Sequence, residues 1–272
     1  MGPERALFDD IALMAQAARE GGALIAAAWN EPREVRSKGA AGPVTEVDLA
    51  VDRLLRGTLL AARPEYGWLS EETPDTDDRL SRRAVFVVDP IDGTRSFIDR
   101  IPECVVSIGL VVDGRAVGGV IFNPMTDEMF EGGVARPATR NGQAIRVTHR
   151  ATLEGATLLG KPEFFKAPQW PKPWPNVIAK YRYPLAYRLA FVAEGGVDGG
   201  LLLGFKNEWD VAAGVAIVEA AGGIVTDPWG GPAVFNSPDP RLSGLVTAGP
   251  ALHPLLCARV SHTSHPCEWP KA

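Results

Sequence analysis

Two aspartates stand around a sharp turn that follows a short apolar run. The run 85–88 (Val-Phe-Val-Val) leads directly into the segment 89–94 (Asp-Pro-Ile-Asp-Gly-Thr). The run predicts a buried strand that ends at Asp89 and the proline behind it, because proline cannot continue a strand ladder. The turn would leave the carboxylates of Asp89 and Asp92, with the Ile91 carbonyl between them, beside one small cavity. Such an oxygen-only set suits a hard cation such as Mg²⁺.

Gly93 and Thr94 complete this segment and add backbone donors. Glycine lets a ligand approach the backbone closely, and the N–H groups of Gly93 and Thr94 could hold an anion. The alternative is local, because Asp89 and Asp92 can cap the turn as Asx residues without any ligand. The segment on its own leaves both interpretations open.

Three further places carry acids beside turns. Glu71 is the first of two glutamates after an apolar stretch, and it could be a ligand or the solvated end of a strand. Thr45 and Asp48 have the spacing of a capping box, which explains both residues without a function. Asp210 falls in the first turn of an apolar helix, where an acid interacts favourably with the helix dipole. The same helix end could also bind an anion.

The elements that must position these residues are helices and strands in irregular alternation. Apolar residues at helical spacing predict helices over 5–29, 45–62, 185–195 and 209–221. Short apolar runs predict strands over 85–88, 105–112, 116–122, 128–134, 199–203, 224–226 and 245–248. The residues Asp113 and Gly114 between two of these runs indicate a hairpin, and 36–43 indicates a glycine-rich loop or hairpin. This mixture favours a layered α+β architecture.

One segment stands out as a candidate boundary. Residues 161–176 contain five prolines and four aromatic residues, which predicts a long irregular connection. We expect an N-terminal half at 1–160 with most of the candidate ligands, and a C-terminal half at 177–260 packed on it. The polar tail 261–272 is expected to be loose.

Composition excludes several classes of protein. The 272 residues carry a net charge of −5, which argues against a nucleic-acid polymer as partner, since such binding needs a clustered basic excess. No run of 18 apolar residues occurs, so no membrane span is expected. Three widely spaced cysteines and the lack of an apolar signal core near the start indicate a reducing cytoplasm.

Four segments in a fixed order carry a resemblance to a known family. They are PVTEVD (43–48), WLSEE (68–72), VVDPIDGTRSF (87–97) and EWDVAAGVAIVEAAGG (208–223). Together they resemble the inositol monophosphatase superfamily, and the similarity extends over 5–255. The resemblance implies a layered α/β/α/β/α sandwich. It also implies a phosphomonoesterase that uses two or three Mg²⁺ ions, is often inhibited by Li⁺, and in many relatives is a homodimer.

The resemblance also implies roles for individual residues. Metal ligands would be Glu71, Asp89, the Ile91 carbonyl, Asp92 and Asp210, with Asp89 shared between two ions. Gly93 and Thr94 would contact the phosphate, with Lys38 as a basic residue nearby. Asp48, together with Thr94 hydrogen-bonded to Glu71, would order the attacking water. The substrate would be a small phosphate monoester.

Individual residues in and around these motifs bear on the choice of substrate. Leu203 stands where animal inositol monophosphatases have a glutamate that contacts inositol, and 160–163 departs from their Ser-Ser-Arg-like stretch. Segments 43–48, 67–72 and 208–210 look more like bacterial 3′(2′),5′-bisphosphate nucleotidases, which act on 3′-phosphoadenosine 5′-phosphate. The alternatives are an inositol-1-monophosphatase, then a histidinol-phosphate or sugar-phosphate phosphatase. A mainly non-catalytic interaction scaffold of the same fold is a further alternative, disfavoured because all the expected carboxylates are present.

A nucleotide would need an adenine surface and a second anion site. The four aromatic residues of 161–176 could stack on a base, and Lys161, Arg182 or Lys206 could supply charge. The alternative, which we favour, is that these aromatic residues belong to the core and its interfaces.

Overall fold

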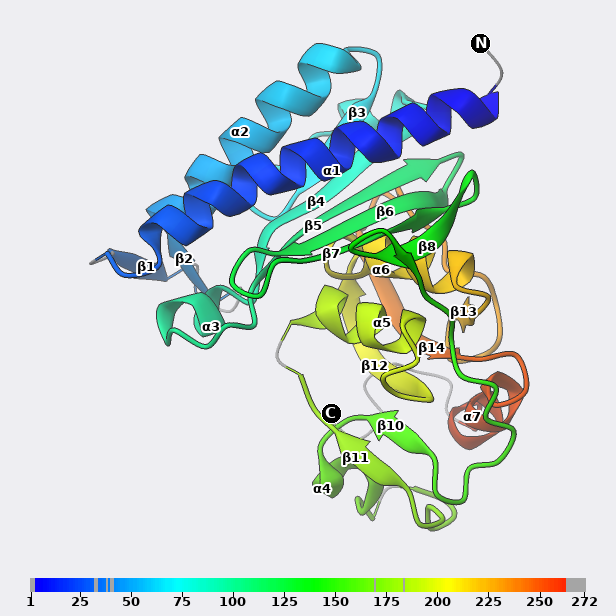
Figure 1. Ribbon diagram of the computed structural model, residues 1–272. Coiled ribbons are helices and arrows are strands. Elements are labelled where there is room, and N and C mark those ends of the chain that lie inside the picture. Colours follow the sequence, from blue (N-terminus) through cyan, green and yellow to red (C-terminus); the bar gives the residue numbers. More distant parts are fainter. Residues whose placement is uncertain are drawn as a thin grey trace.

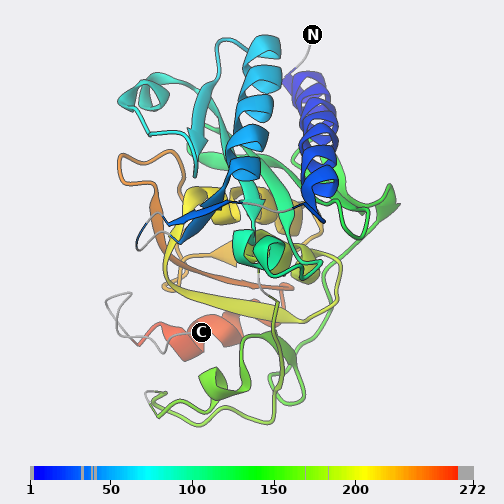
Figure 2. The same cartoon turned by 90° about the vertical axis from the view of Figure 1, so that its left-hand side faces the viewer.

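The computed structural model describes residues 3–31, 34–37, 39, 42–168, 170–182 and 184–262. Two β-sheets alternate with layers of helices (Figure 1). From one outer surface to the other, the layers are a helix pair, a seven-stranded sheet, a second helix pair, a five-stranded sheet and short helices (Figure 2). The α+β class and the layered α/β/α/β/α sandwich implied by the resemblance are therefore confirmed.

The first helix pair covers the outer face of the larger sheet. α1 (Pro3–Ala28) and α2 (Glu46–Ala62) lie side by side across it (Figure 1). One stripe of each helix is apolar, and Met14 and Leu55 are fully buried in the same cluster as Phe86 of the sheet. Burial of these stripes supplies most of the stability of such helices. The two N-terminal helices predicted from the sequence are confirmed.

The seven-stranded sheet has the order β3-β4-β5-β6-β7-β8-β9. Its strands are β3 (Gly67–Ser70), β4 (Ala84–Asp92), β5 (Val105–Val112), β6 (Arg115–Asn123), β7 (Glu128–Gly133), β8 (Arg136–Arg140) and β9 (Gln143–Ala144). β3 runs parallel to β4, and the other neighbours are antiparallel. Asp113 and Gly114 have φ of 49° and 77°, as a type I′ turn between β5 and β6 requires, so the predicted hairpin forms.

The five-stranded sheet has the order β11-β10-β12-β14-β13. Its strands are β10 (Thr157–Leu159), β11 (Ile178–Lys180), β12 (Gly199–Asn207), β13 (Ile224–Thr226) and β14 (Arg241–Ala248). The chain changes from one sheet to the other between β9 and β10. The proline-rich segment 161–176 instead joins β10 to β11 within the second sheet, so the predicted boundary between halves does not lie there.

The middle layer consists of α5 (Leu185–Ala193) and α6 (Glu208–Ala220). Both sheets cover α6, which explains why this helix is apolar on nearly all sides. A Cβ at Gly119 would lie 2.1 Å from the Ala213 carbonyl oxygen, and one at Gly109 would lie 2.7 Å from Ala212. Only glycine on β5 and β6 lets the helix backbone come this close. α6 is therefore held tightly against the sheet that carries the aspartates.

The last layer covers the outer face of the five-stranded sheet with α4 (Pro162–Phe165) and α7 (His253–Val260). The tail predicted to be loose follows α7, and residues 263–272 lie outside the described residues. A small antiparallel hairpin of β1 (Val35–Ser37) and β2 (Pro43–Thr45) precedes α2. No helix in the described part of the chain is long and apolar enough to cross a bilayer.

Candidate active site

The strand that carries the two aspartates is longer than the sequence predicts. β4 continues to Asp92 through an irregular step, since Asp89 pairs with Ser107 and Asp92 with Val105. β4 therefore has one residue more than β5 between these pairs. Pro90 has no N–H for the ladder, which explains the interruption. Residues three apart on a regular strand face opposite sides, and the extra residue brings both aspartates to the same side.

Gly93 turns the chain sharply after β4. Its φ of 97° lies in the left-handed region, and a Cβ would lie 2.8 Å from the Glu103 carbonyl oxygen. Both observations require glycine. The next residue, Thr94, opens the short helix α3 (Thr94–Ile98) directly beside the aspartates. The turn thus places the Gly93 and Thr94 backbone next to the two carboxylates.

Asp48 lies at the start of α2 and reaches the same turn. The N–H and hydroxyl of Thr45 donate to Asp48 Oδ2 at 2.8 and 2.5 Å, which confirms the predicted capping box. The Thr94 hydroxyl lies 2.9 Å from Asp48 Oδ1 and 3.1 Å from the Ile91 carbonyl oxygen. The resemblance implied a bond from Thr94 to Glu71, whereas the contacts described for this hydroxyl lead to Asp48 and Ile91. Asp48 therefore joins α2 to the end of β4.

Asp210 comes to the site from the first turn of α6. Its Oδ2 accepts hydrogen bonds from the backbone N–H and the side-chain amide of Asn207, at 3.2 and 3.3 Å. This is a second capping box, with Asn207 as the N-cap. The helix start thus orients the carboxylate of Asp210 towards Asp92 and Glu71, whose charges it senses.

Glu71 directly follows β3. Two residues near it, Ser70 and Thr73, are held by the carboxylate of Asp52, which the sequence analysis did not identify. Ser70 and Thr73 donate their hydroxyl protons to Asp52, at 2.5 and 2.6 Å. Asp52 is buried and lies one helical turn after Asp48 on α2. The available signal was an acid four residues after Asp48, on the same face of an amphipathic helix.

The carboxylates from these elements repel one another. Burial, and then the charges of Glu71, Asp92, Asp210 and Asp48, raise the pKa of Asp89 well above its usual range. Burial and the charge of Asp210 raise the pKa of Asp92 to about 8. Burial and the charge of Glu71 raise the pKa of Asp210 to about 7. The structure has therefore brought together the acids that the sequence singled out, with more negative charge than their surroundings balance.

The donor set fits Mg²⁺ in its chemistry, because it consists of buried and half-buried oxygen ligands that carry excess negative charge. The side chains are not drawn into a finished coordination shell. Among the described residues, no three histidine, cysteine, aspartate or glutamate side chains lie within reach of one ion. Some oxygens are bonded to backbone donors instead, since Asp92 Oδ2 accepts from Ala186 N at 2.6 Å and Asp89 Oδ1 from Ile91 N at 3.0 Å.

Other predicted site residues lie elsewhere. Lys38 falls outside the described residues. Leu203, expected in the pocket wall, is buried in the apolar cluster beneath α4 and α7. Side chains alternate along β12, so Leu203 points to the outer layer and its neighbour Leu202 to the middle layer. The argument against inositol from Leu203 is therefore wrong.

The aromatic residues of 161–176 belong to the same outer cluster. Phe164, Phe165 and Trp170 are buried, and Trp174 packs edge-on against Phe165 and Trp170. The Trp170 indole donates to the Phe164 carbonyl at 2.6 Å. The favoured interpretation of these aromatic residues as core is confirmed.

Two cations adjoin the carboxylates. Lys206 lies in β12, two residues before α6 begins. Burial lowers its pKa, the charge of Arg188 adds to this, and the charge of Asp210 opposes it. Its ammonium group donates to the carbonyls of 203, 204 and 205 at 2.7, 3.1 and 3.2 Å. Arg188 on α5, which sequence reasoning missed, lies near enough to Asp92 to oppose the rise of its pKa. Of the other cations considered, Arg182 is ion-paired with Glu103.

Acids at the end of a strand and at two helix starts, around the turn at Gly93 and Thr94, define a phosphoric monoester hydrolase in this layered fold. The chain belongs to the inositol monophosphatase family, whose sequence profile matches residues 9–265.

Individual relatives agree with this. The chain is similar to Nus factor SuhB of Escherichia coli (strain K12), with 35% identity over 227 residues that cover 79% of this chain and 84% of that protein. It is similar to Inositol monophosphatase 2 of Solanum lycopersicum, with 34% identity over 235 residues, 82% of this chain and 88% of the other. Among solved structures, the extragenic suppressor protein SuhB of Bartonella henselae has a TM-score of 0.79 and 29% identity, covering 93% of this chain and 98% of that one. A Thermotoga maritima IMPase has a TM-score of 0.79 at 26% identity, covering 93% and 96%.

Proposed function

We propose that the chain hydrolyses small phosphate monoesters with Mg²⁺ ions held by Glu71, Asp89, the Ile91 carbonyl, Asp92 and Asp210. The observation that carries this is the convergence of Asp89 and Asp92 from β4 with Asp210 from α6, where burial and neighbouring carboxylates raise the pKa of each. A folded protein can hold carboxylates this close together when a ligand of opposite charge offsets their repulsion. When bound, Mg²⁺ would neutralise the phosphate and supply a nucleophilic water.

The remaining residues have roles that follow from their positions. The N–H groups of Gly93 and Thr94 would bind phosphate oxygens at the turn. The Thr94 hydroxyl donates within the pair it forms with Asp48, so its lone pairs remain to accept a hydrogen bond from the attacking water. Asp48 would hold that hydroxyl in place. In this arrangement the protein positions the water and the phosphate and does no covalent chemistry.

Removal of metal tests this proposal directly. Phosphate release should cease in excess EDTA and return when Mg²⁺ is added in excess over the chelator. Ca²⁺ should support it poorly, because its larger and looser shell suits in-line geometry less well. Full activity in EDTA would contradict the proposal.

For the substrate, we propose a phosphate ester with a second anionic group, with 3′-phosphoadenosine 5′-phosphate as the first candidate. Arg188 adjoins Asp92 and could bind the second phosphate, whereas backbone carbonyls take the three donors of Lys206. The side chains of Tyr181 and Phe205, which are exposed at 36% and 46%, lie near these cations along the chain and could contact a base. The wording of the motifs supports the same choice.

Inositol 1-phosphate is the second candidate, because relatives reported above are named inositol monophosphatases and none of those is named a nucleotidase. The discriminating measurement is kcat/KM for both substrates with one enzyme preparation. The proposal predicts a value for the nucleotide about tenfold higher or more. Arg188→Gln should raise KM for the nucleotide and leave that for inositol 1-phosphate unchanged. A higher kcat/KM for inositol 1-phosphate would reverse the choice.

Three finer properties remain proposals. Inhibition by Li⁺, a homodimer and a cytoplasmic location follow from the resemblance and the composition. The similarity to a Nus factor raises a second, non-catalytic role, which a variant without activity would separate from hydrolysis.

A further inference from the structure

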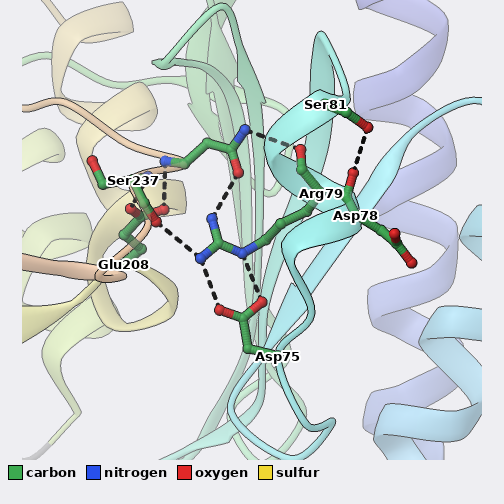
Figure 3. A network of polar contacts seen from close by, with 7 residues as sticks. Asp75, Asp78, Arg79, Ser81, Glu208 and Ser237 are labelled. Carbon is green, nitrogen blue, oxygen red and sulfur yellow. Dashed lines mark hydrogen bonds and ion pairs between the residues drawn. The ribbon is translucent and has the colours of Figure 1, made fainter.

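One arginine is buried within an otherwise exposed segment. Residues 74–78 and 81–83 are exposed, yet Arg79 in the 3₁₀ helix η2 (Asp77–Ser81) is only 2% exposed. Its guanidinium binds Asp75 through two hydrogen bonds, Nε to Oδ1 at 2.7 Å and Nη2 to Oδ2 at 2.8 Å (Figure 3). This fork orients the arginine towards the interior of the molecule.

The guanidinium also donates hydrogen bonds from another edge to a distant part of the chain. Nη1 donates to Asn236 Oδ1 at 2.8 Å and Nη2 to the Ser237 carbonyl at 2.9 Å, while the Asn236 amide donates back to the Arg79 carbonyl at 3.2 Å. These partners lie more than 150 residues apart in sequence. Arg79 thus ties the segment that follows Glu71 to the loop before β14.

Glu208 completes the network. It is the first residue of α6 and is 1% exposed. Its two carboxylate oxygens accept the backbone N–H groups of Asn236 and Ser237, at 2.7 and 3.0 Å (Figure 3). Asp210 lies two residues further along the same helical turn. Through Asn236 and Ser237, the network therefore connects the segment of Glu71 to the helix start of Asp210.

This connection opposes a force within the site. Glu71 and Asp210 carry like charges on two separate elements, and like charges repel each other. Glu71 lies on a segment after a short edge strand and Asp210 lies on a helix, so repulsion tends to move them apart. Groups behind the ligands hold them in position and so contribute to the affinity of a metal site.

We propose that the Arg79–Glu208 network is a positioning device, which holds Glu71 and Asp210 at the separation that a divalent cation needs. The inference rests on the metal site proposed above. Arg79 does not contact the reacting atoms, and it acts through the two backbone segments that it joins.

The test measures binding of Mn²⁺ alone to the full chain, by electron paramagnetic resonance of the free ion. Arg79→Gln should weaken Mn²⁺ binding about tenfold or more, the lower end of the usual effect of groups behind metal ligands. Arg79→Lys should not restore binding, because an ammonium cannot replace the planar fork.

The matched control is Arg63→Gln. Arg63 Nε bonds to buried Asp10 at 2.6 Å, much as Arg79 bonds to Asp75, but it lies at the opposite end of α2 from Asp48. This variant should lose thermal stability and keep the Mn²⁺ affinity of the unaltered protein. If Arg79→Gln and Arg63→Gln lose similar stability and both bind Mn²⁺ within about twofold of the unaltered protein, Arg79 is only structural and the inference is wrong.

A second variant avoids dependence on a folded Arg79→Gln protein. Asn236 has a φ of 55°, which glycine adopts freely, so Asn236→Gly removes the side-chain contacts to Arg79 without backbone strain. It should weaken Mn²⁺ binding about threefold or more. Unchanged affinity in a folded Asn236→Gly protein would overturn the inference. If the unaltered chain binds no Mn²⁺, the metal site itself is wrong, and that result is distinct from a loss confined to the variants.

Discussion

Helices α2 and α6 begin with the same motif, and each presents the acid of that motif to the site. Thr45 caps α2 with Asp48 at the third helical position, and Asn207 caps α6 with Asp210 at the same position. In both, the acid reaches back to the N-cap backbone. A local capping motif thus serves twice to direct a carboxylate inwards.

The two carboxylates nevertheless differ in what surrounds them. Asp48 is 1% exposed and accepts bonds of 2.5–2.9 Å on both oxygens from Thr45 and Thr94. Burial raises its pKa and those hydrogen bonds oppose the rise. The capping bonds of Asp210 are longer, both fall on one oxygen, and its pKa of about 7 reflects burial and Glu71. Protein donors therefore offset part of the burial of Asp48, whereas the bonds to Asp210 are fewer and longer.

We expect the largest loss of activity from a change at Asp210. Asp210→Asn keeps an oxygen for Asn207 but removes a charge that a cation needs. We expect kcat/KM to fall about 1000-fold, equivalent to ~4 kcal/mol of transition-state stabilisation. Without metal, the melting temperature should rise, because repulsion with Glu71 is relieved. Steady-state kinetics and thermal melts in EDTA check the two halves of the prediction, and a loss below about tenfold would remove Asp210 from the metal site.

Replacement of Asp92 should affect activity as replacement of Asp210 does, with little effect on folding. Asp92→Asn retains an oxygen that can accept from Ala186 N, so the turn after β4 should survive. We expect turnover to fall about 100-fold or more with the fold intact, because a neutral amide binds a cation weakly. Circular dichroism and phosphate release measure these separately. An unfolded protein would instead favour the purely structural interpretation of the Asp-Pro-Ile-Asp turn.

The comparison also shows what the sequence could reveal. Both helix starts, the β5–β6 hairpin and the acids at 48, 71, 89, 92 and 210 were visible because caps, turns and apolar periods are local patterns. The side to which Leu203 points was not, because it depends on which layer covers each face of β12. Pairings such as Arg79 with Asn236 leave no local signal either, since tertiary packing alone brings those residues together. Asp52 is intermediate between these cases. The helical spacing predicts the face of α2 on which it lies, but nothing in the sequence predicts its bonds to Ser70 and Thr73.

The pH dependence of the metal-free protein sharpens the comparison further. The pKa values of Asp92 and Asp210 are raised to about 8 and about 7. Folding therefore takes up protons, and stability is lost as the pH rises from the unfolded carboxyl pKa near ~4 through these values. In EDTA we expect a melting temperature several degrees lower at pH 8 than at pH 5.5. Saturating Mg²⁺ should remove most of this difference, because the ion replaces the protons.

Asp92→Asn provides the control for this pH effect, since it removes one of the titrating groups. Its metal-free melting temperature should depend less on pH over the same interval. An unaltered pH dependence in this variant would show that other groups are responsible.

The smallest expected effect concerns the caps themselves. Thr45→Ala removes the hydroxyl that accepts from Val47 N and donates to Asp48, which should cost about 1 kcal/mol of unfolding free energy. Asn207→Ala should cost less, because its side-chain bond to Asp210 is longer. Neither change should lower kcat more than about threefold, since the backbone N–H groups still bond to the acids.

Asp48→Asn, in contrast, should lower activity more than stability, because it weakens the acceptor of the Thr94 hydroxyl. Urea unfolding measures the stability of each variant, and steady-state kinetics measure its activity. If Thr45→Ala and Asp48→Asn lose stability alike and keep full activity, Asp48 serves only as a cap, and the α2 start would then contribute nothing to the site beyond its shape.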